Sequence, residues 1–181
     1  MRAPLFLVAV LLLAGCGAAQ PEPVQVGRAA EPQQAELHWR ESYPSSGQRL
    51  LFTVDSLQIT RKGWSADIAV TNATTIPFAL GGGSGPLVFG LMLFANDNLD
   101  QFKAAADNGR LPVPRLATQF DPAPPDVLAP NQTWRTTMSA PGSLADGSYV
   151  RVSFGPFQAK GDPPKDMHSI VVWITDRSYQ L

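Results

Sequence analysis

The sequence predicts an all-β protein, an antiparallel sandwich of about seven strands with at most one short helix. Apolar and polar residues alternate with a period of two in several segments after residue 49, which is typical of strands with one buried face. Turn signals separate these segments, because the 181 residues include 15 glycines and 17 prolines. A hydrophobic content of 44% is enough for a core, and a charged content of 16% is too low for a disordered chain.

A hairpin opens the predicted domain. Residues 50–59 are rich in β-branched and aromatic side chains, and residues 61–63 carry the turn signal Arg-Lys-Gly. In the stretch 63–72, Trp64 and Ile68 fall on one face and polar residues on the other. Two strands joined by so short a turn are expected to pair in antiparallel fashion.

The middle of the chain is predicted to hold two short strands and the only helix. Residues 78–80 suit a short strand, and the glycine-rich residues 81–86 a loop. Residues 87–95 are continuously apolar, which is typical of a central strand covered on both faces. Residues 98–108 contain several alanines and end before Gly109, which permits a short helix.

Three further strands are expected near the C-terminus. Residues 132–140 place Trp134 on the inner face, and residues 149–157 place Arg151 on the outer face. Residues 169–176 are expected to form a terminal strand that is apolar on both faces. The side chains expected in the core include Trp64, Ile68, Leu91, Val152, Phe154 and Trp173.

Residues 111–130 carry six prolines, so neither a helix nor a central strand is expected there. Long surface excursions of this kind are uncommon unless they are functional or mobile. A segment stiffened by proline loses little entropy on binding, which makes it a candidate partner-binding loop for a protein or a glycan. Its candidate contact residues are Arg110, Arg115, Phe120 and Asp121. The alternative is that the segment bridges the two sheets and packs on the side of the domain.

Two short motifs connect this pattern to a known class of domain. The stretch from Leu144 to Tyr149 resembles the Leu-x-x-Gly-x-Tyr corner of Ig-like and fibronectin-type-III-like domains. The stretch from Leu128 to Asn131 resembles the Leu-x-Pro-Gly turn of small secreted bacterial Ig-like domains, with Asn131 in place of glycine. The resemblance implies an Ig-like sandwich in which the tyrosine hydroxyl bonds to backbone upstream, and it implies no particular function.

The N-terminus has the pattern of an export signal. Arg2 is followed by an apolar run from residue 5 to residue 13, far shorter than the roughly 20 residues of a membrane-spanning helix. The next residues are Leu13-Ala14-Gly15-Cys16, which resemble the lipobox of bacterial lipoproteins. The alternative is an ordinary signal peptide followed by a buried structural cysteine.

The lipobox resemblance implies a lipid anchor. Residues 1–15 would be removed as the signal peptide, and the Cys16 sulfur would carry a diacylglycerol. A chain with two or more acyl groups, such as palmitate, anchors firmly to a lipid bilayer. Gly17 is not the Asp that marks inner-membrane retention in diderm bacteria. The expected location is therefore the bacterial cell envelope, on the outer membrane or the outer face of the cell membrane.

Residues 16–46 are rich in Ala, Gln and Pro and are expected to form a flexible tether, with the domain spanning residues 47–181. Within the tether, residues 35–43 are expected to pack on the domain as a short edge element. His38 lies in this element, either as an exposed residue or as a metal ligand.

A dense set of oxygen-bearing side chains precedes the predicted helix. Calcium sites use such residues, but the glycine and the closing acid of the 12-residue calcium loop are missing. The alternative is a turn with a helix-capping Asp or Asn. The residues concerned are Asn96, Asp97, Asn98 and Asp100.

Three other motifs favour turns or loops over chemistry. Residues 82–86 resemble a G-x-S-x-G nucleophile elbow but end in proline. Residues 166–169 include Asp, His and Ser, but no activated nucleophile is identifiable, so a turn is preferred. Asn72 and Asn131 begin glycosylation sequons and are better explained as turn asparagines.

The composition favours a binding protein over an enzyme or a nucleic-acid-binding protein. A formal net charge of −1 provides no basic stripe for phosphates. With two histidines and one cysteine, the residues indicate no catalytic, metal or cofactor site. We therefore expect a non-enzymatic lipoprotein that binds an envelope protein or glycan. The alternatives are an accessory or substrate-binding subunit of an envelope machine, and a hydrolase or metal-dependent enzyme that uses the long loops.

Overall fold

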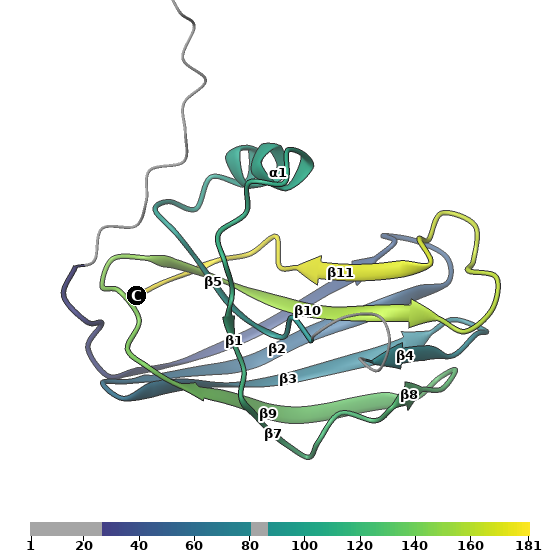
Figure 1. Ribbon diagram of the computed structural model, residues 1–181, viewed down its shortest axis with the longest axis horizontal. Helices are drawn as coiled ribbons and strands as arrows, with labels where there is room; N and C mark the ends of the chain where they lie inside the picture. Colours follow the sequence, from purple (N-terminus) through teal and green to yellow (C-terminus); the bar gives the residue numbers. More distant parts are fainter. Residues whose placement is uncertain (1–26, 81–86) are drawn as a thin grey trace, which may run out of the picture.

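The computed structural model describes residues 27–80 and 87–181. These residues form an all-β, Ig-like antiparallel sandwich with one short helix, as the sequence predicted (Figure 1). Helix α1 spans Leu99–Asp107. The strands within the described ranges are β1 (Gln33–Tyr43), β2 (Arg49–Thr60), β3 (Gly63–Ala73), β4 (Phe78–Leu80), β5 (Gly90–Phe94), β6 (Arg115–Leu116), β7 (Gln119–Asp121), β8 (Val127–Leu128), β9 (Thr133–Pro141), β10 (Tyr149–Ala159), β11 (Ile170–Ile174) and β12 (Tyr179–Gln180).

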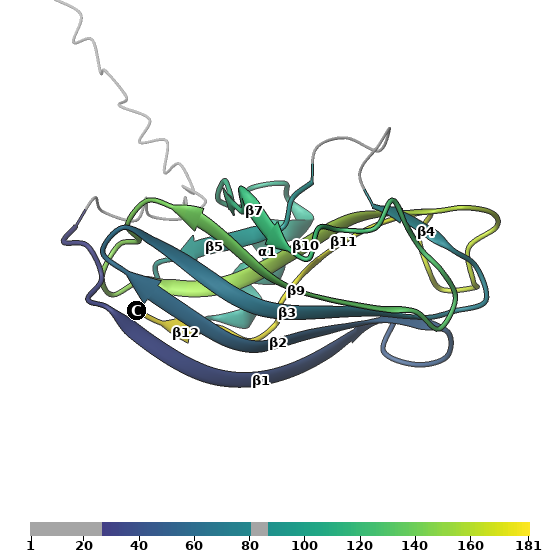
Figure 2. The same ribbon diagram turned by 90° about the horizontal axis from the view of Figure 1, so that it is seen from below.

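The strands form two layers. One sheet has five strands in the order β1-β2-β3-β9-β7, and the other has seven strands, with β6-β5-β10-β4-β8 in order and β11 and β12 also paired with β10. The registers place β5 and β4 end to end along one edge of β10, with β11 and β12 along its other edge. Figure 2 shows β1, β2 and β3 in one layer and β10 and β11 in the other.

The expected hairpin is present as β2 and β3, which pair from Arg49–Ala73 to Thr60–Gly63. The Thr60 hydroxyl accepts hydrogen bonds from the backbone N–H groups of Lys62 and Gly63, which closes the turn. Glycine is required at position 63, because a Cβ there would lie 2.5 Å from the carbonyl oxygen of Ala140 on β9.

An aromatic cluster fills the space between the sheets. Phe89 makes edge-to-face contacts with Trp134, Phe154 and Phe157, at centroid distances of 5.4 to 6.0 Å. Phe52 packs on the same group from β2. The side chains that were expected in the core and are buried are Trp64, Ile68, Leu91, Val152 and Phe154.

Trp173 is only half-buried, so its prediction as a core residue is wrong. Its ring stacks on Phe52 with centroids 5.7 Å apart, but β11 is an edge strand and leaves the indole partly open. The indole N–H donates to a Glu41 carboxylate oxygen at 2.9 Å. Strand β11 is apolar in sequence, but only one of its faces is covered. Ile170 and Val172 on the other face are 51% and 49% exposed.

Strand β1 is longer than the edge element expected within the tether. Its 11 residues pair along β2, with a bulge between Glu36 and Trp39. Trp39 is buried against the core, so the sheet includes residues that composition assigned to a linker. His38 lies in the bulge with a φ of 49° and is exposed.

The proline-rich segment crosses between the two sheets. Strand β6 pairs with β5, β7 pairs with β9, and β8 returns to pair with β4. Phe120 packs against Phe89 and Trp134, and the Pro122 carbonyl accepts hydrogen bonds from Trp134 and Thr136. The structure therefore shows the bridging alternative, whereas partner binding by this segment stays a prediction.

Helix α1 covers the outer face of the seven-stranded sheet beside β5 and β10 (Figure 1). Arg151 faces this side, as expected, but it is 1% exposed because α1 and the C-terminal segment cover it. Its guanidinium carbon lies 4.5 Å from the centroid of the Phe102 ring. The guanidinium donates to the carbonyl oxygens of Thr175 at 2.9 Å, Asp97 at 3.2 Å, and Asp176. Burial lowers the pKa of Arg151, and the charges of nearby carboxylates partly oppose this shift.

The two turn motifs agree only in part with the geometry that their resemblance to Ig-like domains implied. Leu144 is buried and Gly147 has a φ of 73°, as the corner requires. Within the described residues, however, the Tyr149 hydroxyl makes no hydrogen bond to backbone. Asn131 has a φ of 62°, a conformation that asparagine tolerates better than other non-glycine residues. Of the described helical residues, none forms a segment long and apolar enough to cross a membrane.

Candidate functional site

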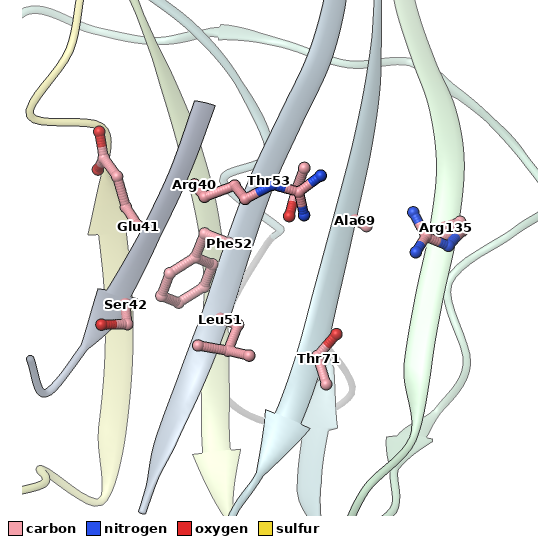
Figure 3. A pocket seen from close by; sticks show the side chains of 9 residues that line it. All are labelled: Arg40, Glu41, Ser42, Leu51, Phe52, Thr53, Ala69, Thr71 and Arg135. Atoms are coloured by element: carbon pink, nitrogen blue, oxygen red, sulfur yellow. The ribbon is translucent and has the colours of Figure 1, made fainter. Parts of the chain in front are cut away.

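A groove of about 320 Å³ lies on the outer face of the five-stranded sheet, across strands β1, β2, β3 and β9 (Figure 3). Phe52 packs in the aromatic core, and the Glu41 carboxylate accepts hydrogen bonds from the Trp173 indole and the Asp176 N–H, so these two line the groove only at its edge. The lining residues are Arg40, Glu41, Ser42, Leu51, Phe52, Thr53, Ala69, Thr71 and Arg135.

Strand register builds the centre of this groove. Arg40 pairs with Thr53, Thr53 pairs with Ala69, and Ala69 pairs with Arg135. Residues paired directly across neighbouring strands project to the same face of a sheet, so these four side chains form one row. We call them the arginine row. Three strand spacings separate the backbones of its two arginines by about 14 Å.

The arginine row has small residues in its middle and long cationic residues at its ends. Thr53 and Ala69 form the floor, and Figure 3 shows the side chains of Arg40 and Arg135 extending from either side toward it. Ala69 is only 3% exposed even though it lies on the outer face, because the surrounding side chains shelter it. The result is a shallow trough with one arginine on each side.

The two arginines are weakly neutralised by the protein. Within the described part of the chain, Arg40 has neither an ion pair nor a hydrogen bond from its side chain. Arg135 lies 3.9 Å from an Asp55 carboxylate oxygen, and the two side chains are 71% and 36% exposed. Exposed pairs of this kind contribute little, so both guanidinium groups remain available to an anion.

A second acid on this face is already occupied. The Asp67 carboxylate accepts hydrogen bonds from the hydroxyls of Ser56 at 2.7 Å and Thr137 at 2.6 Å. Thr71 and Thr133 form another cross-strand hydroxyl pair at 2.7 Å. Hydroxyl groups therefore border the arginine row, and the Asp67 carboxylate is directed toward them.

The lipidation residues lie outside the part of the chain that the structure describes. This applies to Cys16 and to the recognition residues Leu13, Ala14 and Gly15. The same holds for residues 82–86, which resemble a nucleophile elbow. Their assignments stay predictions.

The four candidate residues of the proline-rich segment do not converge on one surface. Arg110 is exposed just after α1, and Arg115 is exposed on β6 of the seven-stranded sheet. Asp121 is exposed on β7 of the other sheet, while Phe120 is half-buried against the core. The segment acts as a strap along one side of the sandwich.

The oxygen-bearing residues before α1 cap the helix. The Asn98 side chain accepts a hydrogen bond from the Gln101 N–H at 2.9 Å, and the Asn96 side chain accepts one from the Asn98 N–H at 3.0 Å. The Asp97 carbonyl accepts from Arg151, and Asp100 lies in the first turn, where its charge suits the helix dipole. No group of three or more His, Cys, Asp or Glu residues that could hold a metal ion occurs in residues 27–80 and 87–181.

The remaining motifs have structural roles. Asp166 has a φ of 73° in a turn before β11, and His168 stacks on Tyr43 at 6.2 Å. Asn72 is fully buried, and its amide donates to the carbonyl oxygens of Ile76 and Leu128. Asn72 therefore lies near the end of β3 and not in a turn, and its side-chain oxygen accepts the Thr74 N–H of the turn that follows.

Sequence reasoning missed the arginine row. Arg135 lies on the outer face of a recognised strand, and Arg40 lies in the segment expected as an edge element. Their proximity depends on β9 pairing with β3, which is about 60 residues earlier in the chain, and on the exact registers. Period-two alternation identifies the outward positions but gives neither strand order nor register.

Comparison of the chain with protein-family models, with curated proteins and with solved structures gives no match. A function for this chain must therefore be inferred from the geometry of its described residues.

Proposed function

We propose that this protein is a lipid-anchored lipoprotein of the bacterial envelope whose sandwich domain is a non-catalytic binding module. The arginine row is the observation that carries this proposal. It offers two available cations over a floor of small side chains, on a sheet that holds them in fixed register. Sites built on strands keep their geometry better than sites built on loops.

The direction in which the chain enters the domain supports presentation away from a membrane. The Ala30 N–H bonds to the Leu144 carbonyl, and the Gly147 N–H bonds to the Leu181 carbonyl. The first described residues and the C-terminus therefore lie at the same end of the sandwich (Figure 1). Arg40 is in the second half of β1, toward the opposite end. A lipid on Cys16 would leave the groove on the half of the sheet remote from the anchor.

Two experiments test the two parts of this proposal. In cells supplied with labelled palmitate, the wild-type chain should incorporate label and Cys16→Ala should not. A Cys16→Ala chain that is still labelled would contradict the lipid anchor.

The binding function is tested with the mature chain, residues 16–181, carrying Cys16→Ala so that no lipid contributes. It should sediment with envelopes isolated from the source cells. Arg40→Gln/Arg135→Gln should reduce that binding at least about tenfold, because each arginine would lose its charge-assisted hydrogen bonds to the bound envelope component. The matched control Arg110→Gln/Arg115→Gln removes the same charge from the proline-rich segment and should bind like wild type. If only the control variant loses envelope binding, the proline-rich segment is the binding surface. If the envelope component that binds is a protein, an accessory subunit of an envelope machine is favoured.

A further inference from the structure

We propose that the arginine row binds the anionic group, a carboxylate or a phosphate, of an acidic envelope glycan. This inference rests on the proposed function, in which the groove is the binding site. It adds the chemical class of the ligand.

The charge arrangement selects an anion. Arg40 has no neutralising partner among the described residues, and the acid that pairs with Arg135 is Asp55 at 3.9 Å. Two other carboxylates lie close by, but Asp67 is bonded to hydroxyls and Glu41 to Trp173 and backbone N–H groups. Both guanidinium groups extend toward one trough, so an anion in the trough can be contacted from two sides. The planar guanidinium binds carboxylate and phosphate oxygens through two parallel hydrogen bonds, which suits either group.

The shape of the trough suits a single anionic group with space above it. The two floor positions carry Thr53 and Ala69, so no bulky side chain lies between the arginines. The Thr53 hydroxyl adds one donor to those of the guanidinium groups. Ala69→Leu would place a branched side chain in the trough without changing charge.

The surrounding surface favours a glycan over a protein. Protein interfaces depend on buried aromatic and apolar anchors at their centre. On the outer face of β1, β2, β3 and β9, the described residues offer mainly hydroxyls and amides, such as Ser42, Gln58 and Ser65, and Leu51 beside the groove is half-buried. The exposed large apolar residues are all on other parts of the fold: Val113, Leu116, Val127, Ile170 and Val172. A hydrated, hydroxyl-rich ligand with a regular negative charge matches this face.

Titration calorimetry on the mature chain, residues 16–181 with Cys16→Ala, tests the inference with four probes. The probes are oligogalacturonate, which carries carboxylates, a glycerol-phosphate oligomer, which carries phosphodiesters, neutral dextran, and poly-L-glutamate. We expect the protein to bind oligogalacturonate or the glycerol-phosphate oligomer and not to bind dextran. Added salt should weaken the binding. The better of the two identifies the anion as carboxylate or phosphate.

Variants connect the binding to the arginine row. Arg40→Gln/Arg135→Gln and Ala69→Leu should each weaken it at least about tenfold, while Arg110→Gln/Arg115→Gln should change it less than about twofold. All the substituted arginines are exposed, so a circular dichroism melt should show that both double variants still fold. The same melt checks the fold of Ala69→Leu, because Ala69 is 3% exposed.

Three results would overturn the inference. Poly-L-glutamate bound as tightly as either glycan would identify an acidic protein as the ligand. Binding by the Arg40→Gln/Arg135→Gln variant as tight as that of wild type would show that the arginine row is not the binding site. Failure of both anionic oligomers, while the envelopes still bind through Arg40 and Arg135 in the sedimentation assay, would reject the glycan class and leave the proposed function standing.

Discussion

Replacing Arg151 by methionine tests whether this residue holds α1 and the C-terminal segment on the seven-stranded sheet. Methionine keeps the apolar stem of the side chain and removes the guanidinium group. Three carbonyl oxygens, those of Asp97, Thr175 and Asp176, then lose their donor. Phe102 loses the cation that lies over its ring at 4.5 Å.

The size of the effect depends on which groups can regain water. Asp97 and Asp176 are exposed, so their carbonyls can be hydrated, but Thr175 is 1% exposed. An unsatisfied buried carbonyl costs about 1–3 kcal/mol, and loss of the cation–π contact costs about 0.5–2 kcal/mol. Removing the Arg151 Nε, which has no hydrogen-bond partner, returns roughly 1 kcal/mol. Together these contributions predict that the free energy of unfolding falls by about 2 kcal/mol, less than the roughly 3–5 kcal/mol typical of breaking a buried charge pair.

Urea denaturation followed by tryptophan fluorescence measures this change. In a thermal melt, the melting temperature should fall by about 4–8 °C, since 1 kcal/mol corresponds to about 2–4 °C in a chain of this length. Arg177→Met is the matched control, because Arg177 is exposed two residues after Thr175 and should tolerate the change. A loss below about 0.5 kcal/mol for Arg151→Met would refute this role of Arg151, because the cost of burying the charge would then equal what its contacts contribute.

Three further predictions concern the core, the N-terminal ion pairs and the strap. Ile68→Asp puts an unpaired charge at a position that is 2% exposed, so the chain should lose at least about 3 kcal/mol of stability; a melting temperature within a degree or two of wild type would show the face assignment to be wrong. The hydrogen bonds from Arg28 and Arg61 lower the pKa of Glu31 below its ordinary 4.5, so its contribution to stability is present above that pH and is lost as the pH falls through the lowered value. Glu31→Gln should therefore be less stable than wild type at neutral pH and equal to it at pH 2 in denaturation curves, and a constant difference across the range would exclude this linkage. Replacing residues 111–126 with a Gly/Ser linker should lower the melting temperature sharply, because Phe120 and the Pro122 carbonyl pack on the core; unchanged melting would show that the strap is dispensable.

Much of the fold could be predicted because strands with one buried face carry a local signal. The alternation in residues 63–72 arises because Trp64 and Ile68 face the core, and the buried strand β5 is continuously apolar because α1 covers its outer side. Helix α1 was predictable from its alanines and from the capping asparagine before it. These features depend on neighbours in sequence, which is why composition and spacing reveal them.

The misassigned features depend on contacts between distant segments. Trp173 was expected in the core, but a terminal strand can also be an edge, and the sequence does not say which. The start of β1 has the composition of a linker, yet its pairing with β2 orders it. Arg151 faces outward in the alternation and is buried because α1 and the C-terminal segment cover it. The arginine row is the extreme case, since it requires four strands in the correct order and register.

Photocrosslinking in intact source cells tests most directly whether the arginine row is the binding surface. A photoreactive amino acid is placed at Thr53 on the groove floor, at Ser65 on the same face of β3, or at Val113 in the proline-rich segment, where the native side chain is 88% exposed. We predict an envelope-derived adduct from position 53 that disappears in the Arg40→Gln/Arg135→Gln background, with no comparable adduct from positions 65 and 113. An adduct that forms at position 113 and is unaffected by the two arginine substitutions would contradict binding at the arginine row.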